Sequence, residues 1–151
     1  MKIKKHLSIL FVLGAIYLGN QVFAQANSPV QEFEKEEIAA NDKLVVLWTS
    51  GDREVALKMV FMYTYNAKAR GWWEDITLVV WGPSAKLLTE DKELQDYMAR
   101  IMEAGVTVKA CKGCSDQYGV SEKLEELGIT VLYIGKELTD YIKEGREMLT
   151  I

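Results

Sequence analysis

Histidine is the residue type that this sequence lacks most. The only histidine among the 151 residues is His6, within a leader that we expect to be removed. Residues 25–151 therefore contain no imidazole, the usual general base for a serine or cysteine nucleophile and a frequent metal ligand. This excludes Ser–His catalysis, Cys–His catalysis and histidine-ligated metal sites from that part of the chain.

Cysteine and proline are also scarce. The two cysteines, Cys111 and Cys114, form a C-x-x-C motif, and the two prolines are Pro29 and Pro83. Haem attachment is excluded because Ser115, not histidine, follows the motif. A tetrahedral metal site needs four ligands, of which one cysteine pair supplies two. A thioredoxin-like oxidoreductase would need a proline after the motif, and both prolines precede it.

The first 24 residues have the three parts of an export signal. "MKIKK" is basic, "LSILFVLGAIYL" is an apolar run of 12 residues, and "QVFA" has small residues at positions 22 and 24. A membrane anchor is the alternative, but the run is shorter than the ~20 residues that cross a bilayer. We predict a cleaved signal peptide over 1–24, a mature start at Gln25, and a periplasmic or secreted protein.

Basic residues are in the minority once the leader is removed. Three of the 18 basic residues lie in the leader, so 15 remain against 22 acidic ones, a net charge of −7. An acidic surface argues against nucleic acid or a membrane as partner. Residues 25–42, "QANSPVQEFEKEEIAAND", lack an apolar period and are predicted to be an acidic tether.

Residues 43–151 have the pattern of one α/β domain. "KLVVLWT" is a continuous apolar run of strand length, typical of a strand buried on both faces. Further β-rich runs follow glycines at which helices are expected to end, namely Gly71, Gly105, Gly128 and Gly145. Strands that alternate with helices predict a three-layer α/β/α sandwich with a largely parallel sheet of about five strands.

Two helices are predicted with particular faces. In the helix 91–104, one apolar stripe comprises Leu94, Tyr97, Met98, Ile101 and Met102. In the helix 53–70, the core face is expected to hold Val55, Met59, Met62, Tyr63 and Asn66. A second stripe in that helix, either covered by the tether or forming a subunit interface, comprises Leu57, Phe61 and Tyr65.

A ligand site is expected beyond the carboxyl ends of the parallel strands. Three loops are predicted there: "TSGD" at 49–52, "GPS" at 82–84, and "CKGCSDQYG", which carries the cysteines. The candidate pocket residues are Thr49, Ser50, Gly51, Asp52, Trp81, Gly82, Ser84, Lys112 and Tyr118. For Ser50, Asp52 and Ser84, helix N-caps are the alternative interpretation.

The cysteine pair is predicted to be reactive. Lys109 and Lys112 lie close in sequence and should favour a thiolate, although Asp116 opposes them. Such a thiolate can attack sulfane sulfur and hold it as a persulfide, or cycle through a disulfide. A structural disulfide remains open, but so short a loop would stabilise the fold only weakly.

Residues 43–151 resemble the DsrE/DsrF-like family of small sulfur-relay proteins. The resemblance rests on "LWTSGD", "VVWG" and "VTVKACKGCSDQYGVSEKLEELGITV". It implies a parallel five-stranded α/β/α fold, assembly into oligomers, and Cys111 as the sulfur-accepting residue. Cys114 resembles the second cysteine of a soluble subset of the family. Relay members that feed tRNA modification or sulfite reduction are cytoplasmic, whereas this chain is expected to be exported.

Three functions follow as hypotheses. The first is an exported sulfur carrier or sulfurtransferase, with Cys111 as persulfide carrier and Cys114 as resolving thiol. Its partners would be a second copy and a sulfur donor or acceptor, either a protein or a small thiol, with no cofactor. The second is a ligand-binding or interaction module with a redox-labile disulfide and a pocket of Trp48, Trp81 and Tyr118. The third is a Cu(I) or other soft-metal binder completed across a subunit interface.

Overall fold

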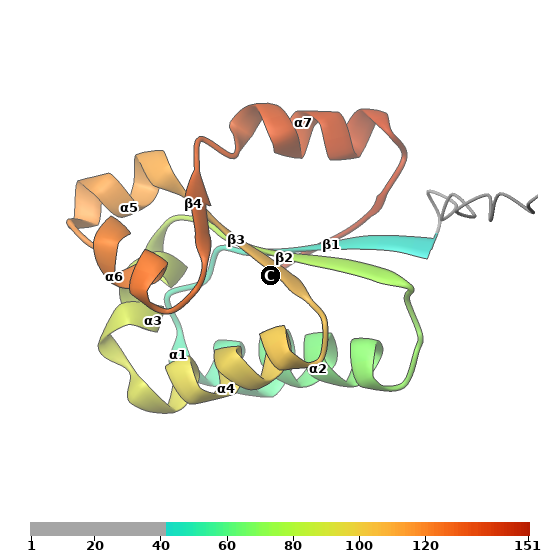
Figure 1. Cartoon of the computed structure of the whole chain (residues 1–151), viewed down its shortest axis with the longest axis horizontal. Helices are drawn as coiled ribbons and strands as arrows, with labels where there is room; N and C mark the ends of the chain where they lie inside the picture. The colour runs from blue at the N-terminus through green and yellow to red at the C-terminus, as the bar shows by residue number, and fades with distance from the viewer. Residues whose placement is uncertain (1–41) are drawn as a thin grey trace, which may run out of the picture. The chain divides into compact units, whose positions relative to one another are not determined.

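The structure, a computed structural model, describes residues 42–151. The predicted leader and nearly all of the tether lie outside the described residues. The five strands are β1 (Lys43–Trp48), β2 (Asp75–Val80), β3 (Thr107–Cys111), β4 (Thr130–Leu132) and β5 (Glu147–Thr150). They form one parallel sheet in the order β4-β3-β2-β1-β5 (Figure 1), which confirms the predicted fold class.

Strand β1 lies in the interior of the sheet and contributes to both of its faces. Val45 and Val46 are both fully buried, although their side chains belong to different apolar clusters on opposite faces. Val46 pairs with Leu78 of β2 on one side and with Leu149 of β5 on the other. A strand covered above and below needs apolar residues at successive positions, which explains the unbroken apolar run.

The helical segments are α1 (Arg53–Val55), η2 (Ala56–Phe61), α2 (Met62–Ala69), α3 (Pro83–Glu90), α4 (Lys92–Glu103), α5 (Lys112–Tyr118), α6 (Ser121–Glu126) and α7 (Gly135–Lys143). Within the described residues, no helix combines the length and apolar character needed to cross a membrane. The glycines expected to follow helices all have positive φ angles, between 65° and 94°. Glycine adopts this conformation without the steric cost that a side chain brings, so these predictions are confirmed.

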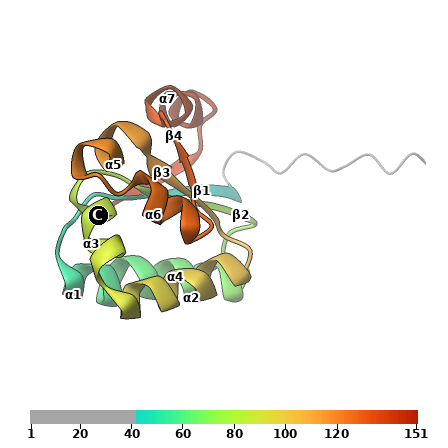
Figure 2. The same ribbon diagram turned by 60° about the vertical axis from the view of Figure 1, so that its left-hand side comes forward.

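The two faces of the sheet are covered unequally. Figure 1 and Figure 2 show α7 over one face and the long helices α2 and α4 over the other. Helices α3, α5 and α6 gather at the end of the sheet where the strands finish (Figure 1). The larger apolar cluster lies on the face of α2 and α4, and a smaller one lies under α7.

Helix α4 agrees closely with its prediction. Asp91 is its N-cap, and the carboxylate accepts a hydrogen bond from the Leu94 N–H at 3.1 Å. Leu94, Met98 and Ile101 are buried, so the predicted stripe faces the core. Arg53 donates to Asp91 at 2.7 Å and thereby ties the start of α1 to the start of α4.

The predicted core face of the helix 53–70 is correct for Val55 and Tyr63, which pack against the larger cluster, and wrong for its two methionines. Phe61, proposed for an interface, is fully buried, whereas Met59 and Met62, assigned to the core, are 52% and 51% exposed. The cause is the π-helical segment η2, which the sequence pattern did not predict. Its hydrogen bonds span five residues rather than four, so side chains after Ala56 rotate away from the 3.6-residue period. Leu57 and Tyr65 are half-buried against the core.

Candidate functional site

The two cysteines lie together at the carboxyl end of β3. Cys111 is the last residue of that strand, opposite Leu132 of β4, and Cys114 lies in the first turn of α5. Both thiols are free, and Cys114 packs against the same apolar cluster to which Cys111 belongs. Cys111 is only 8% exposed, whereas Cys114 is half-buried. The pair therefore consists of one enclosed thiol and one that is more accessible.

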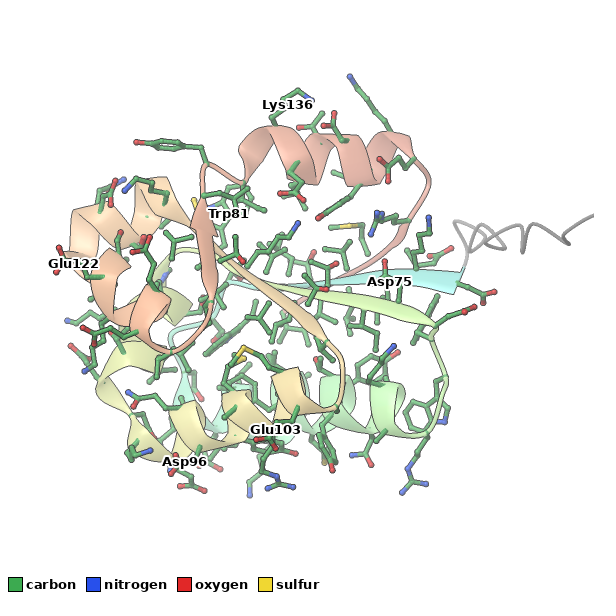
Figure 3. All side chains as sticks on the ribbon, viewed as in Figure 1. Asp75, Trp81, Asp96, Glu103, Glu122 and Lys136 are labelled. Carbon is green, nitrogen blue, oxygen red and sulfur yellow. The ribbon has the colours of Figure 1, made fainter. Side chains whose placement is uncertain are left out.

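An apolar layer surrounds the pair on the α7 face of the sheet. Cys111 belongs to one buried cluster with Val45, Val79, Ile134, Leu138 and Tyr141. Cys114 and the half-buried Trp81 pack against that cluster, and Figure 3 labels Trp81 on this side of the sheet. Trp81, proposed as a pocket residue, therefore accompanies the cysteines. The surrounding side chains limit the approach of water to Cys111.

Gly82 contributes a backbone group to the site. Its N–H donates a hydrogen bond to Cys114, which lowers the pKa of that thiol. Burial raises the pKa of Cys114 more strongly than Gly82 lowers it, and the neighbouring Cys111 raises it further. The pKa of Cys114 therefore lies above its usual value. The φ of 71° and ψ of −134° at Gly82 are a conformation that side-chain-bearing residues rarely adopt. The sequence indicated Gly82 as a candidate pocket residue but not that its backbone affects Cys114.

The lysines beside the cysteines are engaged elsewhere. Lys109 donates to Glu137 and, at 2.9 Å, to the Tyr141 hydroxyl, while Lys112 donates to Asp116 at 2.9 Å. Both ammonium groups thus face carboxylates, and the sequence-based expectation that they activate a thiol is wrong for Cys114. Lys112 thus forms an exposed ion pair with Asp116 on the surface of α5.

A half-buried polar network fastens α7 to the sheet. Partial burial lowers the pKa of Lys109, but hydrogen bonds to Glu137 and Tyr141 outweigh it and the pKa is raised. Burial likewise raises the pKa of Glu137, yet the bonds from Lys109 and Tyr141 lower it below its usual value. Arg146 extends the network, because its guanidinium lies 4.2 Å from the Tyr141 ring centroid and 3.2 Å from Asp75. Glu137 and Tyr141 were not singled out by sequence, since their pairing joins distant segments.

The "TSGD" loop forms structural contacts. The Thr49 hydroxyl donates to the Ile151 carbonyl at 3.1 Å, and the Ser50 hydroxyl accepts from the Asp52 N–H at 3.1 Å. The Asp52 carboxylate accepts from the Val55 N–H at 2.9 Å, so Asp52 is an N-cap, as the alternative interpretation held. A side chain at Gly51 would meet the Pro83 side chain at 3.0 Å, so the two loops pack closely.

Ser84 joins two strand ends. Its buried hydroxyl donates to the Trp48 carbonyl at 2.8 Å and accepts from the Trp81 N–H at 3.0 Å. Neither alternative for Ser84 is correct, because the N-cap of α3 is Gly82 and the hydroxyl faces no ligand space. Its contacts hold β1 and β2 in register next to the cysteines.

The proposed pocket of Trp48, Trp81 and Tyr118 is not formed. Trp48 lies in the cluster on the opposite face and contacts Phe61 edge-on, with ring centroids 5.1 Å apart. Tyr118 is 43% exposed at the end of α5. The ring of Trp48 is thus separated from Trp81 by the sheet itself.

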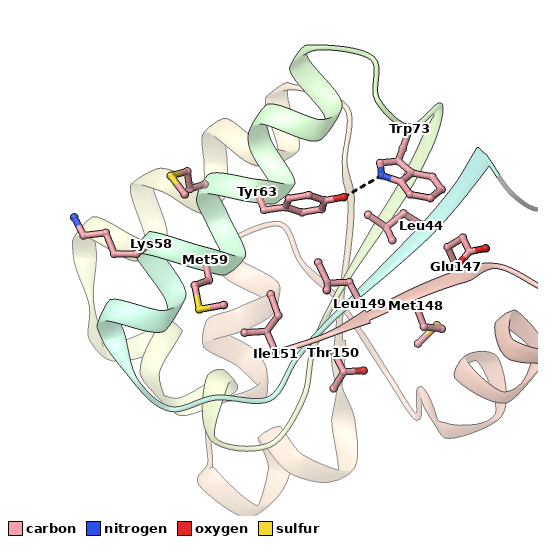
Figure 4. A pocket seen from close by; sticks show the side chains of 11 residues that line it. Leu44, Lys58, Met59, Tyr63, Trp73, Glu147, Met148, Leu149, Thr150 and Ile151 are labelled. Carbon is pink, nitrogen blue, oxygen red and sulfur yellow. Dashed lines mark hydrogen bonds between the residues drawn. The ribbon is translucent and has the colours of Figure 1, made fainter.

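The structure reveals an apolar groove that the sequence did not predict. It has a volume of about 640 Å³ and lies between β5 and the helical segment that contains η2 (Figure 4). Met59, Met62 and Leu149 line it, and the Trp73 indole donates to the Tyr63 hydroxyl at 3.1 Å along its wall. The candidate pocket residues do not line this groove. Within residues 42–151, no three Asp, Glu, His or Cys side chains gather in a way that could hold a metal ion.

Comparison with known proteins agrees with this architecture. The model of the DsrE/DsrF-like family matches residues 42–151. A conserved protein of unknown function from Bacteroides thetaiotaomicron (BT1422) is 40% identical, with 76% of this chain and 99% of that chain covered and a TM-score of 0.73. The YchN protein of E. coli shares the fold at 19% identity, with 72% and 98% covered and a TM-score of 0.53. No curated protein matches the chain significantly. The chain belongs to the DsrE/DsrF-like family.

Proposed function

We propose that this protein is an exported sulfur carrier in which Cys111 holds sulfane sulfur as a persulfide. Membership of the DsrE/DsrF-like family indicates a sulfur-relay role in general. The observation that carries the finer proposal is the pair of free thiols at the carboxyl end of β3, of which Cys111 is buried in an apolar cluster and Cys114 is more accessible. The export signal predicted over residues 1–24 supports a location outside the cytoplasm.

Sulfur loading is a thiol exchange and needs no cofactor. A protein thiolate attacks the outer sulfur of a donor persulfide, a new S–S bond forms, and the donor leaves as a thiolate that takes up a proton. Unloading is the reverse of loading: an acceptor thiolate attacks the outer sulfur of the protein persulfide, and the protein thiolate leaves. The apolar side chains around Cys111 restrict unwanted attack by water and small thiols while the sulfur is stored.

The persulfide on Cys111 can also react with Cys114. Its thiolate can attack the inner sulfur of the Cys111 persulfide, which forms the Cys111–Cys114 disulfide and releases hydrosulfide. An external dithiol reductant would then restore both thiols. In this role Cys114 is the resolving thiol, and its position in the first turn of α5, directly after Cys111, gives the proximity that the reaction needs.

Peptide mapping after equilibration with a sulfane-sulfur donor tests the proposal. Residues 25–151 are incubated with glutathione persulfide, alkylated and digested. We expect a mass gain of one sulfur atom on the Cys111 peptide. The control is the double variant Cys111→Ala, Cys114→Ser, which should take up none. Sulfur on neither cysteine of the wild type would contradict the proposal, and a quantitative disulfide without uptake would favour the redox-labile interaction module.

A further inference from the structure

The two thiols differ in how a donor can reach them. Cys111 is 8% exposed and lies beneath Ile134, Leu138 and Tyr141, which belong to α7 and the turn before it. Cys114 is half-buried, packs against the same cluster, and lies three residues after Cys111 in the first turn of α5. A donor that carries its sulfur on a peptide or protein would meet Cys114 first, because exchange requires direct access to the attacking sulfur.

We propose that sulfur enters this protein at Cys114 and is then passed to Cys111, where it is stored. This inference rests on the proposed function and adds an order of transfer to it. Cys114 thereby acts as the receiving thiol, in addition to any role in resolving the loaded state. The spacing "CKGC" places the two residues on one turn, next to the strand end.

The chemistry balances without an oxidant or a reductant. The Cys114 thiolate first takes the outer sulfur from the donor persulfide, and the donor leaves as a thiol after protonation. The Cys111 thiolate then attacks the outer sulfur of the Cys114 persulfide, so one S–S bond forms as another breaks. Cys114 leaves as a thiolate and is protonated, while the sulfane sulfur keeps its oxidation state throughout.

Two reactions of the Cys114 persulfide compete. Attack by the Cys111 thiolate on the outer sulfur expels Cys114 as a thiolate and moves the sulfur to Cys111. Attack by Cys111 on the inner sulfur would instead expel hydrosulfide and produce the disulfide. The two routes therefore differ in products: transfer leaves sulfur on Cys111, whereas the competitor releases sulfide.

Direct loading of Cys111 would require α7 to move away from the sheet. The hydrogen bonds among Lys109, Glu137 and Tyr141 oppose this movement, because they join the middle of α7 to β3. A variant that weakens these bonds should accelerate direct loading but leave entry through Cys114 unchanged. Glu137→Gln is such a variant, and it removes no atom from the cysteine pair.

A time course with glutathione persulfide tests the order of transfer. Samples of the wild type, Cys114→Ser, Cys114→Ala and Glu137→Gln are quenched by alkylation and mapped at successive times. In the wild type we expect sulfur on Cys114 first and on Cys111 later. Both Cys114 variants should load Cys111 at least about tenfold more slowly, because the accessible entry thiol is gone. Glu137→Gln should load at the wild-type rate.

The outcomes separate this inference from the function on which it rests. Wild-type loading rates at Cys111 in both Cys114 variants would overturn the order of transfer and leave the carrier function standing. Faster loading in Glu137→Gln would likewise indicate direct entry beneath α7. Release of sulfide with disulfide formation, and no sulfur on Cys111, would overturn the transfer in favour of the competing route. Failure of the wild type to load at either cysteine would contradict the carrier function itself.

Discussion

The two faces of the sheet divide stability and chemistry between them. The face covered by α2, η2 and α4 holds the larger cluster, with Trp48, Phe61, Leu94 and Ile101 fully buried. The face under α7 has a smaller cluster that contains Cys111, and polar side chains fasten its helix. A face that relies on few apolar contacts can open at lower cost. The comparison suggests why the thiols lie under α7 and not in the larger core.

Aromatic packing is the clearest difference between the faces. Phe61 contacts Trp48 and Tyr97 edge-on, with centroid distances of 5.1 Å and 5.5 Å. The Arg100 guanidinium lies 5.0 Å from the Tyr97 ring centroid and 5.2 Å from that of Tyr65. On the α7 face, the buried aromatic residue Tyr141 instead uses its hydroxyl to bond Lys109 and Glu137. One face is thus held mainly by ring contacts and the other partly by hydrogen bonds.

Truncation of Phe61 should have the largest effect. Phe61→Ala leaves a cavity between Trp48 and Tyr97, and we expect a loss of about 3–5 kcal/mol in unfolding free energy. Leu138→Ala on the α7 face is the matched comparison. Its expected loss is about 2 kcal/mol, because a single helix covers the site and can shift to fill part of the cavity. Urea denaturation measures both. An equal or larger loss for Leu138→Ala would contradict the assignment of the main core.

Removal of the Lys109 ammonium should have an intermediate effect. Lys109→Met deprives Glu137 and Tyr141 of a donor in a half-buried setting, and we expect a loss of about 1–2 kcal/mol in unfolding free energy. The control is Lys136→Met in α7 itself, whose pair with Asp140 is exposed and should contribute far less to stability. Similar losses in the two variants, measured by urea denaturation, would show that the network does not hold α7.

Acid should weaken the α7 face through Glu137. Its pKa is lower in the folded protein than in the unfolded chain, so the folded state binds fewer protons there. The stabilisation is complete above the unfolded value of about 4.3 and is lost as the pH falls through the folded pKa. Between pH 7 and pH 3, the wild type should therefore lose more unfolding free energy than Glu137→Gln. The unfolding free energies of wild type and Glu137→Gln are measured as a function of pH. Two curves that run parallel would contradict this role of Glu137.

Substitutions in the groove should change folding stability least. Met59→Ser alters a side chain that is 52% exposed, so we expect a change within ~0.5 kcal/mol for the isolated chain. Association between copies, which the family resemblance implies, should make the effect larger and dependent on protein concentration. Lys58 and Glu147 both line this groove, and their opposite charges would allow ion pairs between two copies related by a two-fold axis. Light scattering of wild type and Met59→Glu at micromolar concentration would decide between a monomer and an assembly at this surface.

Much of the fold could be predicted from local patterns. The unbroken apolar run of β1, the stripe of α4 and the glycines after the helices each reflect a constraint within a few residues. The exposed methionines and the buried Phe61 of the helix 53–70 could not be predicted, because the π-helical segment η2 changes the side-chain period without a distinct sequence signal.

The candidate site was predicted only in part. The position of Cys111 at a strand end followed from the alternation of strands and helices. Three interactions at the site join residues that are far apart in sequence. They are the ion pair of Lys109 with Glu137, the hydrogen bond of Ser84 to Trp48, and the effect of the Gly82 backbone on Cys114. Such contacts depend on strand order and helix placement, and a motif search on one sequence does not reveal them.

The thiol state of the protein, as isolated after rapid alkylation, tests the central claim most directly. Mass spectrometry of the protein purified from the cell envelope would distinguish free thiol, disulfide and persulfide at each cysteine. The account predicts a population with one additional sulfur atom on Cys111, removable by a thiol reductant. A protein found entirely as the Cys111–Cys114 disulfide, and unable to take up sulfur after reduction, would contradict it.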